Sequence, residues 1–319
     1  MYKGFYGLKE DPFKINPDPR YLYLTKQIEE SLSALMYGIQ TRKGFVTLTG
    51  EVGTGKTTLL NRLLAWLHGQ QVKTAFLFNS RINSKQLFDF VLAEFEISCN
   101  SNSKSDQLLR LNSWLLERYR SGETAVLIID EAQNLTLPVL EEVRLLTNLE
   151  TTTDKLLQIV LAGQPELDEK LKMPELRQLR QRVMLLCKTS PFNKEETAEY
   201  ISERLRIAGV NPSGKPIFSA RAVETVHLYS SGIPRLINLL CEHCLVNGYA
   251  EQLRLIEVEA VEAVAREFQL DEVESVAPAA EGNPDGDVFN SESFIHNLGE
   301  ALLRFRAGTV GTPTPRGRK

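Results

Sequence analysis

The chain has 319 residues, 42% of them hydrophobic, which is enough for one large or two medium domains with substantial cores. A net charge of −4 gives no overall basic field of the kind that marks nucleic-acid binding, and four scattered cysteines exclude a disulfide-rich scaffold. The N-terminus lacks the apolar centre of a signal peptide and no apolar run approaches the roughly 20 residues that span a bilayer, so we expect a soluble cytoplasmic protein without a membrane span.

The first part of the chain predicts a parallel α/β domain. Residues 1–25 are rich in aromatic rings, Pro and Asp, which indicates an irregular but ordered segment packed on the core. Helical spacing follows over 26–41, and apolar runs then alternate with helical patterns. The expected strands are 45–49, 74–79, 125–129, 156–162 and 183–187. This alternation predicts a five-stranded parallel sheet with helices on both faces, which we assign to residues 26–190.

From residue 191 the pattern is helical throughout, and it predicts a small all-helical lid domain over 191–270. The expected helices are 194–208, 219–230, 234–248 and 257–269, separated at Gly and Pro residues. Cys241 and Cys244 lie three residues apart in the third helix. We interpret them as core residues, because one such pair supplies only half of the usual ligands of structural zinc.

The C-terminal part predicts a tethered docking helix. Residues 271–291 lose their apolar periodicity and are rich in acids, Pro, Ala and Gly, which indicates an acidic linker. Amphipathic spacing returns over 292–306, and residues 307–319 are expected to be a disordered basic tail. We expect the 292–306 helix to dock on a protein partner, with nucleic acid or an anionic membrane as alternatives.

Residues 50–57 read GEVGTGKT and match the pattern G-x-x-x-x-G-K-[ST], between an apolar β-rich run and a helical run. The glycines let consecutive N–H groups curl around an anion, and the following helix adds the positive end of its dipole. Lys56 is expected to reach the β- and γ-phosphates of ATP. The predicted nucleotide-binding residues of this loop are Gly50, Val52, Gly53, Thr54, Gly55, Lys56, Thr57 and Thr58.

An acidic pair, Asp130-Glu131, ends the third predicted strand. Together with the phosphate loop it predicts ATP hydrolysis. Thr57 and Asp130 are expected to hold Mg²⁺, and Glu131 to orient and deprotonate the attacking water.

With these motifs the chain resembles the AAA+ ATPases, and most closely the ExeA-like ATPases, also called general secretion pathway protein A. The resemblance is carried by residues 5–23, by IDEAQN at 129–134, by LAGQPEL at 161–167 and by GIPR at 232–235, as well as by the phosphate loop. It covers about residues 1–268. Transposition ATPases of the TnsC, TniB and MuB type share the same core.

The resemblance implies roles for two further polar residues. Gln164 would be sensor 1, which detects the γ-phosphate from between the phosphate loop and the acidic pair. Arg235, at the start of a lid helix, would be sensor 2 and would bridge the lid to the γ-phosphate with bidentate hydrogen bonds. The alternatives are a strand-end Gln before Pro165 and a solvated Arg at a helix start.

The resemblance also implies that an arginine reaches into a neighbouring subunit's site and stabilises transition-state charge. Arg177, Arg180 and Arg182 are the candidates, with Arg182 preferred and Arg180 next. A hexameric ring or helical filament of this chain is therefore expected, and the alternative reading of the cluster is a solvated basic helix face.

Two weaker expectations concern the surroundings of the nucleotide. Asn79 ends the second predicted strand, where the resemblance implies a polar residue that contacts Glu131. Tyr21, Leu22 and Tyr23 are expected to wall the adenine, because purines favour flat apolar partners, and core packing is the alternative.

These features lead to two alternative functions. The first is an ATP-driven oligomeric switch that assembles or remodels an envelope complex, such as a secretin, pilus or polysaccharide-export system, in the cytoplasm or at the periphery of the inner membrane. The second is a regulator of transposition that forms ATP-dependent filaments on duplex DNA and recruits a transposase through its C-terminal tail. A third class, a nucleotide-dependent interaction module without productive hydrolysis, is disfavoured by Glu131.

Overall fold

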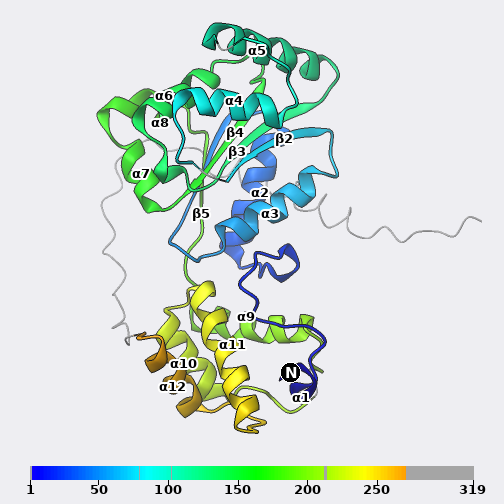
Figure 1. Ribbon diagram of the computed structural model, residues 1–319, viewed down its shortest axis with the longest axis vertical. Coiled ribbons are helices and arrows are strands. Elements are labelled where there is room, and N and C mark those ends of the chain that lie inside the picture. Colours follow the sequence, from blue (N-terminus) through cyan, green and yellow to red (C-terminus); the bar gives the residue numbers. More distant parts are fainter. Residues whose placement is uncertain (1, 79, 102, 212–213, 271–319) are drawn as a thin grey trace, which may run out of the picture.

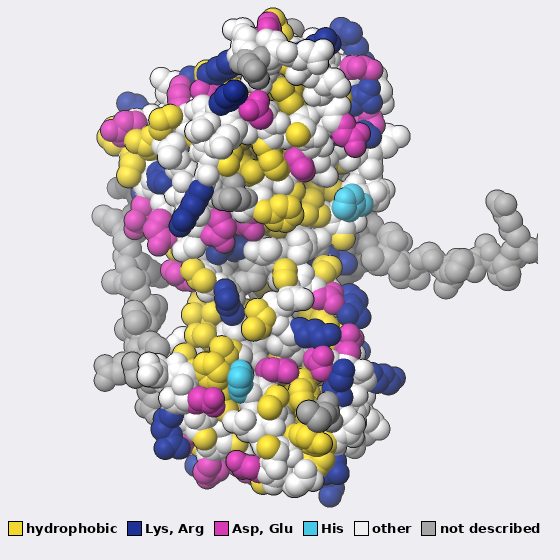
Figure 2. Space-filling view, in the orientation of Figure 1, with side chains coloured by type: hydrophobic (Ala, Val, Ile, Leu, Met, Phe, Trp, Pro, Cys, Tyr) yellow, Lys and Arg dark blue, Asp and Glu magenta, His cyan; other side chains and the backbone are white. Residues whose placement is uncertain are grey.

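The molecule, a computed structural model, consists of a sheet lobe and a helical lobe joined at a waist (Figure 1). The structure describes residues 2–78, 80–101, 103–211 and 214–270. The acidic linker, amphipathic helix and basic tail expected within 271–319 lie outside these residues. On the face shown in Figure 2, hydrophobic side chains gather around the waist between the lobes.

A five-stranded parallel sheet forms the centre of the first lobe, in the order β2-β3-β4-β1-β5. The strands are β1 (Phe45–Thr49), β2 (Val72–Leu77), β3 (Thr124–Ile129), β4 (Leu157–Gly163) and β5 (Leu185–Lys188). In a parallel sheet the carboxyl ends of all strands meet at one edge, so the loops that follow β1, β3 and β4 lie together. The predicted α/β fold class is confirmed.

Helices cover both faces of this sheet because alternate side chains of each strand point to opposite faces. Val46 and Leu48 of β1 pack toward α2 and α3, whereas Phe45 packs toward the opposite layer. The first layer consists of α2 (Lys26–Gln40) and α3 (Lys56–Leu67). The second contains α4 (Ser84–Glu94), α5 (Lys104–Arg120), α6 (Leu137–Leu146) and α7 (Pro165–Leu171). Short helices lie at its margin: η2 (Ala132–Asn134), η3 (Pro174–Leu176) and α8 (Arg177–Arg180).

The second lobe is the helical lid. It consists of α9 (Lys194–Ile207), α10 (Ala220–Ser230), α11 (Pro234–Ala250) and α12 (Val258–Glu267). Its apolar side chains, including the fully buried Cys241 and Cys244, join the same continuous core as α2 and α3. No helix in the described part of the chain is both long and apolar enough to cross a bilayer.

The N-terminal strap, residues 2–25, runs from the lid to the sheet lobe. It contains α1 (Tyr2–Tyr6) and η1 (Pro19–Tyr21), and α1 lies beside the lid in Figure 1. The Tyr2 hydroxyl donates to the Glu242 carboxylate of α11 at 2.7 Å, and the Lys9 N–H donates to the Ala208 carbonyl at 2.7 Å. The strap was expected to pack on the core, but its first half packs on the lid, because its rings and N–H groups find partners there.

β1 has its expected bounds, β3 starts one residue earlier than expected and β4 is shifted by one residue; the larger differences are in β2 and β5. β2 starts at Val72 rather than residue 74, because Val72 and Lys73 already pair with Thr124 and Ala125 of β3. β5 covers Leu185–Lys188 instead of 183–187, in register with β1. Both are edge strands. In β2 the exposed Lys73 interrupts the apolar run, and before β5 the apolar pair Val183 and Met184 extends the run beyond the strand.

Candidate functional site

The phosphate loop connects β1 to α3 in a conformation that depends on glycine. Gly53 and Gly55 have φ values of 83° and 94°, which side chains rarely adopt. The Thr54 hydroxyl shares a hydrogen bond with the Thr189 hydroxyl at 2.7 Å, and both residues are buried. The loop is therefore held from behind by the segment that follows β5, while Val52 on its outer side is exposed.

Lys56 is a buried cation at the start of α3. Its ammonium group donates to the carbonyls of Gly50 at 2.6 Å and Glu51 at 2.9 Å. Burial lowers the pKa of Lys56, and the negative charges of Glu131 and Asp130 partly oppose this shift. A desolvated ammonium group beside backbone N–H groups is well suited to an anionic phosphate.

Asp130 lies beside Thr57 at the carboxyl end of β3. The Thr57 hydroxyl donates to one oxygen of the Asp130 carboxylate at 3.1 Å, and the Glu131 N–H donates to the other at 2.9 Å. Burial raises the pKa of Asp130, against the opposing effect of these two hydrogen bonds. A buried carboxylate next to a hydroxyl provides the oxygen ligands that Mg²⁺ prefers, so these two predicted metal ligands fit the ion.

Glu131 has its carboxylate held by two amide side chains. One oxygen accepts from Gln133 at 2.6 Å and from Gln164 at 3.2 Å. The Gln133 side-chain oxygen in turn accepts from the backbone N–H of Gln164 at 3.1 Å, which fixes the side-chain amide of Gln133. Sequence reasoning gave Gln133 no role, although its place two residues after Glu131 was visible. Asn79, expected to contact Glu131, lies outside the described residues.

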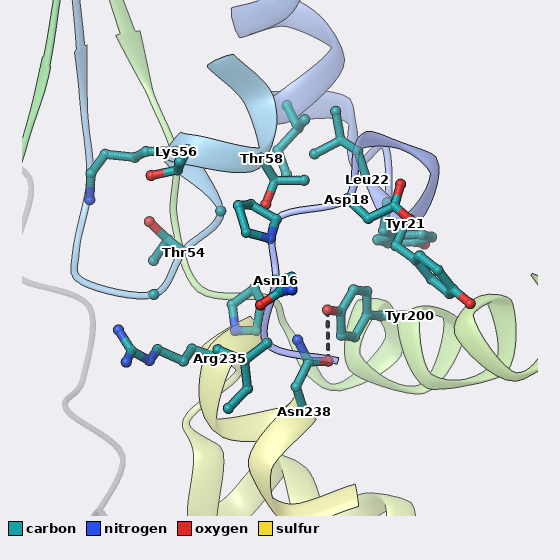
Figure 3. A pocket seen from close by; sticks show the side chains of 18 of the residues that line it. Asn16, Asp18, Tyr21, Leu22, Thr54, Lys56, Thr58, Tyr200, Arg235 and Asn238 are labelled. Carbon is teal, nitrogen blue, oxygen red and sulfur yellow. Dashed lines mark hydrogen bonds between the residues drawn. The ribbon is translucent and has the colours of Figure 1, made fainter. Parts of the chain in front are cut away.

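Arg235 joins the lid to the phosphate loop. Its N–H donates to the Gly53 carbonyl at 3.3 Å, and a Cβ on Gly53 would lie 2.8 Å from the Arg235 Cβ. Figure 3 shows its side chain extending from α11 below Thr54 and Lys56. The first turn of α11 is thus in contact with the loop.

A cavity of about 300 Å³ runs from the phosphate loop to the strap and the lid (Figure 3). Predicted residues from both lobes line it: Tyr21, Leu22, Tyr23, Val52, Gly53, Thr54, Gly55, Lys56, Thr57, Thr58, Glu131, Gln164 and Arg235. The structure therefore brings most of the predicted nucleotide site together. Tyr200, Arg204 and Asn238 of the lid also line the cavity, and sequence reasoning missed all three.

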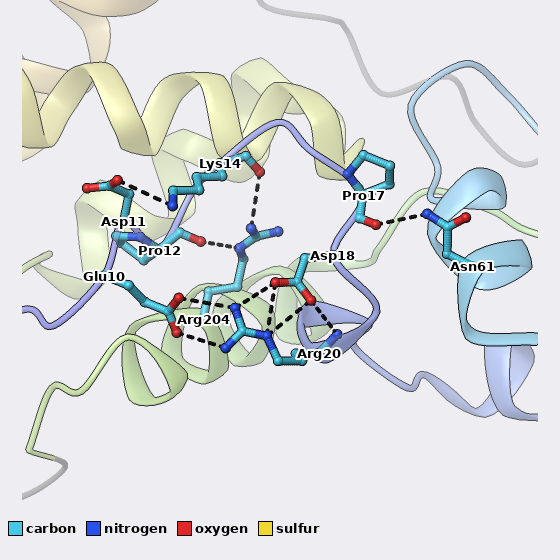
Figure 4. A network of polar contacts seen from close by, with 9 residues as sticks. All are labelled: Glu10, Asp11, Pro12, Lys14, Pro17, Asp18, Arg20, Asn61 and Arg204. Carbon is cyan, nitrogen blue, oxygen red and sulfur yellow. Dashed lines mark hydrogen bonds and ion pairs between the residues drawn. The ribbon is translucent and has the colours of Figure 1, made fainter. Parts of the chain in front are cut away.

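Arg204 fastens the strap to the lid (Figure 4). Only 5% of it is exposed, and its guanidinium donates to the carbonyls of Pro12 at 2.5 Å and Lys14 at 3.2 Å. The guanidinium carbon also lies 4.5 Å from the centre of the Tyr21 ring. Nearby, Arg20 binds the carboxylates of Asp18 and Glu10 on the strap itself. Nothing in the sequence distinguishes Arg204 from a solvated helix arginine.

The three arginines predicted to act in a neighbouring site do not line this cavity. Arg177 and Arg180 are exposed on α8. Arg182 instead donates within its own chain, to the Thr147 hydroxyl and the Asn148 side-chain oxygen, both at 2.5 Å. The geometry thus favours Arg180 over Arg182 as a group free to reach another subunit, the reverse of the expected order.

Comparison with known proteins agrees with this geometry. A family model described as AAA domain matches residues 39–171. General secretion pathway protein A of Aeromonas hydrophila is 43% identical over 251 residues, which make up 78% of this chain. The chain belongs to the general secretion pathway protein A family. It spans 45% of the length of that curated family member.

Solved structures show the same fold at low identity. The Aeropyrum pernix ORC2 protein, determined as ADPNP-ADP complexes, is 16% identical with a TM-score of 0.59, covering 81% of this chain and 72% of that one. The RuvB Holliday junction branch migration motor of Thermotoga maritima is also 16% identical, with a TM-score of 0.52, covering 88% and 82%. This member of the general secretion pathway protein A family therefore has the P-loop fold of the AAA ATPases.

Proposed function

We propose that the protein binds ATP with Mg²⁺ in the cavity between its lobes and hydrolyses it to ADP and phosphate. The observation that carries this proposal is the Glu131 carboxylate, held by two amides at the edge of the cavity that contains the phosphate loop. A carboxylate in a fixed position beside bound phosphates is what the activation of a water molecule needs.

The other residues divide the remaining work. Lys56 and Arg235 approach the cavity as cations and stabilise negative charge on the phosphates. Thr57 and Asp130 would hold Mg²⁺, which would neutralise further charge there. Gln164 contacts Glu131 directly, so a γ-phosphate that attracts its amide also changes how the base is held.

We further propose that the nucleotide state governs the assembly of copies of this chain into a ring or filament. Exposed Arg180 would supply positive charge to the neighbouring site. The name of the relative, general secretion pathway protein A, supports a role in secretion. Assembly of an envelope complex, and a place in the cytoplasm or at the periphery of the inner membrane, stay predictions. Docking of a partner through 292–306 stays a prediction. The DNA-associated alternative also stays a prediction, because the similar ORC2 and RuvB structures are only 16% identical and show the fold alone.

The Glu131→Gln variant tests the catalytic proposal. It keeps the shape of the side chain and removes the base, so we expect turnover to fall at least about a hundredfold while ATP binding persists. Phosphate release and binding of a fluorescent ATP analogue measure the two effects. Glu169→Gln, the same change at an exposed position of α7, is the matched control. Undiminished turnover in Glu131→Gln would refute the role of Glu131, and Lys56→Ala should lose both binding and turnover.

A further inference from the structure

Helix α11 presents a second polar side chain to the cavity, one turn beyond Arg235. Asn238 lies three residues after Arg235, so both occupy the same face of the helix, and both line the cavity. Asn238 is 7% exposed, whereas Arg235 is exposed. In Figure 3 Arg235 lies below the phosphate loop and Asn238 lies toward Tyr200 and Asn16. The phosphate end and the opposite end of the cavity are thus contacted by one helix.

The hydrogen-bonding direction of Asn238 is determined by its neighbours. The Tyr200 hydroxyl oxygen lies 2.6 Å from Arg204 Nη1. Because a guanidinium can only donate, this oxygen accepts the hydrogen bond. The hydroxyl proton is then donated to Asn238 Oδ1, 2.9 Å away. The hydroxyl of Tyr200 therefore fixes which end of the Asn238 amide faces it, and the amide nitrogen, which can only donate, is left for a ligand.

The chain of hydrogen bonds from Arg204 through Tyr200 to Asn238, here called the relay, is buried, and burial keeps its side chains from reorienting. Tyr200 is 4% exposed and Arg204 5%, so water does not compete for their hydrogen bonds. Burial raises the pKa of Tyr200, and the phenol therefore keeps the proton that it donates. Arg204 is also bound by the strap carbonyls of Pro12 and Lys14, so the ring of Tyr200 cannot turn without disturbing the strap.

The base of a nucleotide bound at Lys56 must enter this end of the cavity. The strap residues Ile15 and Leu22 give this end of the cavity apolar surface, and the amide of Asn16 lines it as well. A flat base fits against such apolar surface, and a donor whose direction is fixed by its neighbours then discriminates between the edge groups of different bases. Adenine carries an acceptor at N1, whereas guanine and hypoxanthine carry an N1–H donor there.

We propose that Asn238, oriented by Tyr200 and Arg204, reads the N1 position of the base and so selects adenine over purines that carry N1–H. Asn238 Nδ2 donates to N1 of adenine. An N1–H at the same position leaves two donors facing each other in a buried site, and neither is satisfied. This inference rests on the proposed function, because it assumes that a nucleoside triphosphate occupies the cavity.

Binding of defined nucleotides to the full chain tests the proposal. The probes are ATP, 1-deaza-ATP, 7-deaza-ATP and ITP, measured by competition against a fluorescent ATP analogue. We expect 7-deaza-ATP to bind like ATP. We expect 1-deaza-ATP and ITP to bind about tenfold or more weakly, the effect of one lost hydrogen bond in a buried site.

Two variants locate the effect at Asn238. Asn238→Leu should bind ATP and 1-deaza-ATP equally, because the donor is gone. Asn238→Asp keeps an acceptor for Tyr200 and presents a second acceptor, so the ratio of ITP to ATP affinity should rise about tenfold or more over wild type. Asn247→Asp places the same charge on α11 outside the cavity lining and should leave the ratio unchanged.

Tyr200→Phe tests the positioning role of the relay. It leaves Asn238 in place but frees its amide to rotate, so the preference for ATP over ITP should fall while ATP binding remains. Melting temperatures near wild type show that each variant is folded. Equal binding of ATP and 1-deaza-ATP by the wild type would overturn the inference and leave the proposed function intact. Failure of the wild type to bind any of these nucleotides would instead overturn the proposed function.

Discussion

At Glu131, one carboxylate oxygen accepts two amide hydrogen bonds, and the second amide belongs to the predicted γ-phosphate sensor. The shorter bond, from Gln133, is the one that no motif assigned. Gln133 is itself anchored, because its backbone carbonyl accepts from the Lys170 ammonium group and its side-chain oxygen accepts from Gln164. We infer that Gln133 positions the base while Gln164 reports on the phosphate.

The Gln133→Met variant should therefore lower kcat by about tenfold to a hundredfold with little change in KM, since the base loses its orientation but the phosphates keep their ligands. Gln133→Glu places a like charge beside Glu131, so the acidic limb of the pH–rate profile should move to higher pH. Steady-state kinetics across pH measure both effects. Gln178→Met, an exposed change on α8, is the control, and a kcat near wild type in Gln133→Met would contradict the positioning role.

Asp130 illustrates a conflict between function and stability. Its pKa is raised by burial in the folded protein, so the unfolded chain loses this proton at lower pH than the folded one. At any pH above the pKa of this carboxyl in the unfolded chain, the Asp130 carboxyl therefore lowers the free energy of unfolding. Below that pKa the carboxyl is protonated in both states and the penalty disappears. Asp130→Asn should melt higher than wild type at pH 7, with the difference vanishing toward pH 3, when scanned without nucleotide.

The same Asp130→Asn variant should lose the stabilisation that Mg²⁺ adds to bound ATP, because one oxygen ligand is gone. Thr57→Val removes the other predicted ligand without removing a charge. It therefore separates the loss of a metal ligand from the loss of the carboxylate charge. A melting temperature below that of the wild type at pH 7 in Asp130→Asn would show that the carboxylate stabilises the fold instead.

Local pattern sufficed to predict the loop and the acidic pair, because the chemistry of each motif is contained in a few consecutive residues. Gln133, Tyr200, Arg204 and Asn238 could not be predicted in the same way. Each lies on a turn or helix where its residue type is ordinary, and its role depends on a partner brought near by the fold. Arg182 shows the converse. The sequence predicted a role in a neighbouring subunit, but the fold places the side chains of Thr147 and Asn148, which follow α6, within hydrogen-bonding distance of Arg182.

Among the elements, α11 connects the lid to the site, and the turn before it sets its position. Gly232 has a φ of 72°, and the Phe192 N–H donates to its carbonyl at 2.8 Å. A Cβ at Gly232 would lie 1.8 Å from the Phe192 carbonyl oxygen. Periodicity predicted the helices on both sides of this turn, but this close backbone approach depends on tertiary packing.

Gly232→Ala should destabilise the protein by about 1–3 kcal/mol or more, because backbone strain and the clash with Phe192 add together. The displacement of α11 should also weaken ATP binding, since Arg235 and Asn238 move with it. Thermal unfolding and fluorescent-nucleotide titration measure these effects. Gly4→Ala, where the structure shows open space and no positive φ, should change neither, and equal behaviour of the two variants would contradict this account.

For the whole molecule, Arg180 and Arg182 differ in whether they could complete the nucleotide site of a second copy. Arg180 is exposed on α8 and does not line the cavity of its own chain. Arg182 binds α6 and the residues after it, so its loss should reduce stability rather than remove a trans-acting charge. Mixing experiments separate these two roles.

Arg180→Ala and Glu131→Gln subunits should each be inactive alone, and a mixture should regain ATPase activity. In the mixture, a Glu131→Gln subunit still has Arg180, and an Arg180→Ala subunit still has Glu131. Where the two are neighbours, that Arg180 can complete the site that contains the intact Glu131. Phosphate release against mixing ratio measures the recovery. Arg182→Ala in the same design should show a lowered melting temperature without complementation. Recovery with Arg182→Ala but not with Arg180→Ala would restore Arg182 as the trans-acting residue.

Within the described residues, the backbone passes between the lobes twice, near residues 14–17 in the strap and near 189–192 after β5 (Figure 1). A body attached at one point can swivel freely, whereas a body attached at two separated points rotates about the line through them. The two crossings therefore favour rotation of the lid about the line that joins them over other movements. A change of the bound nucleotide would then rotate the lid about this line. In a ring or filament, each copy would rotate its lid in the same direction relative to its own sheet lobe.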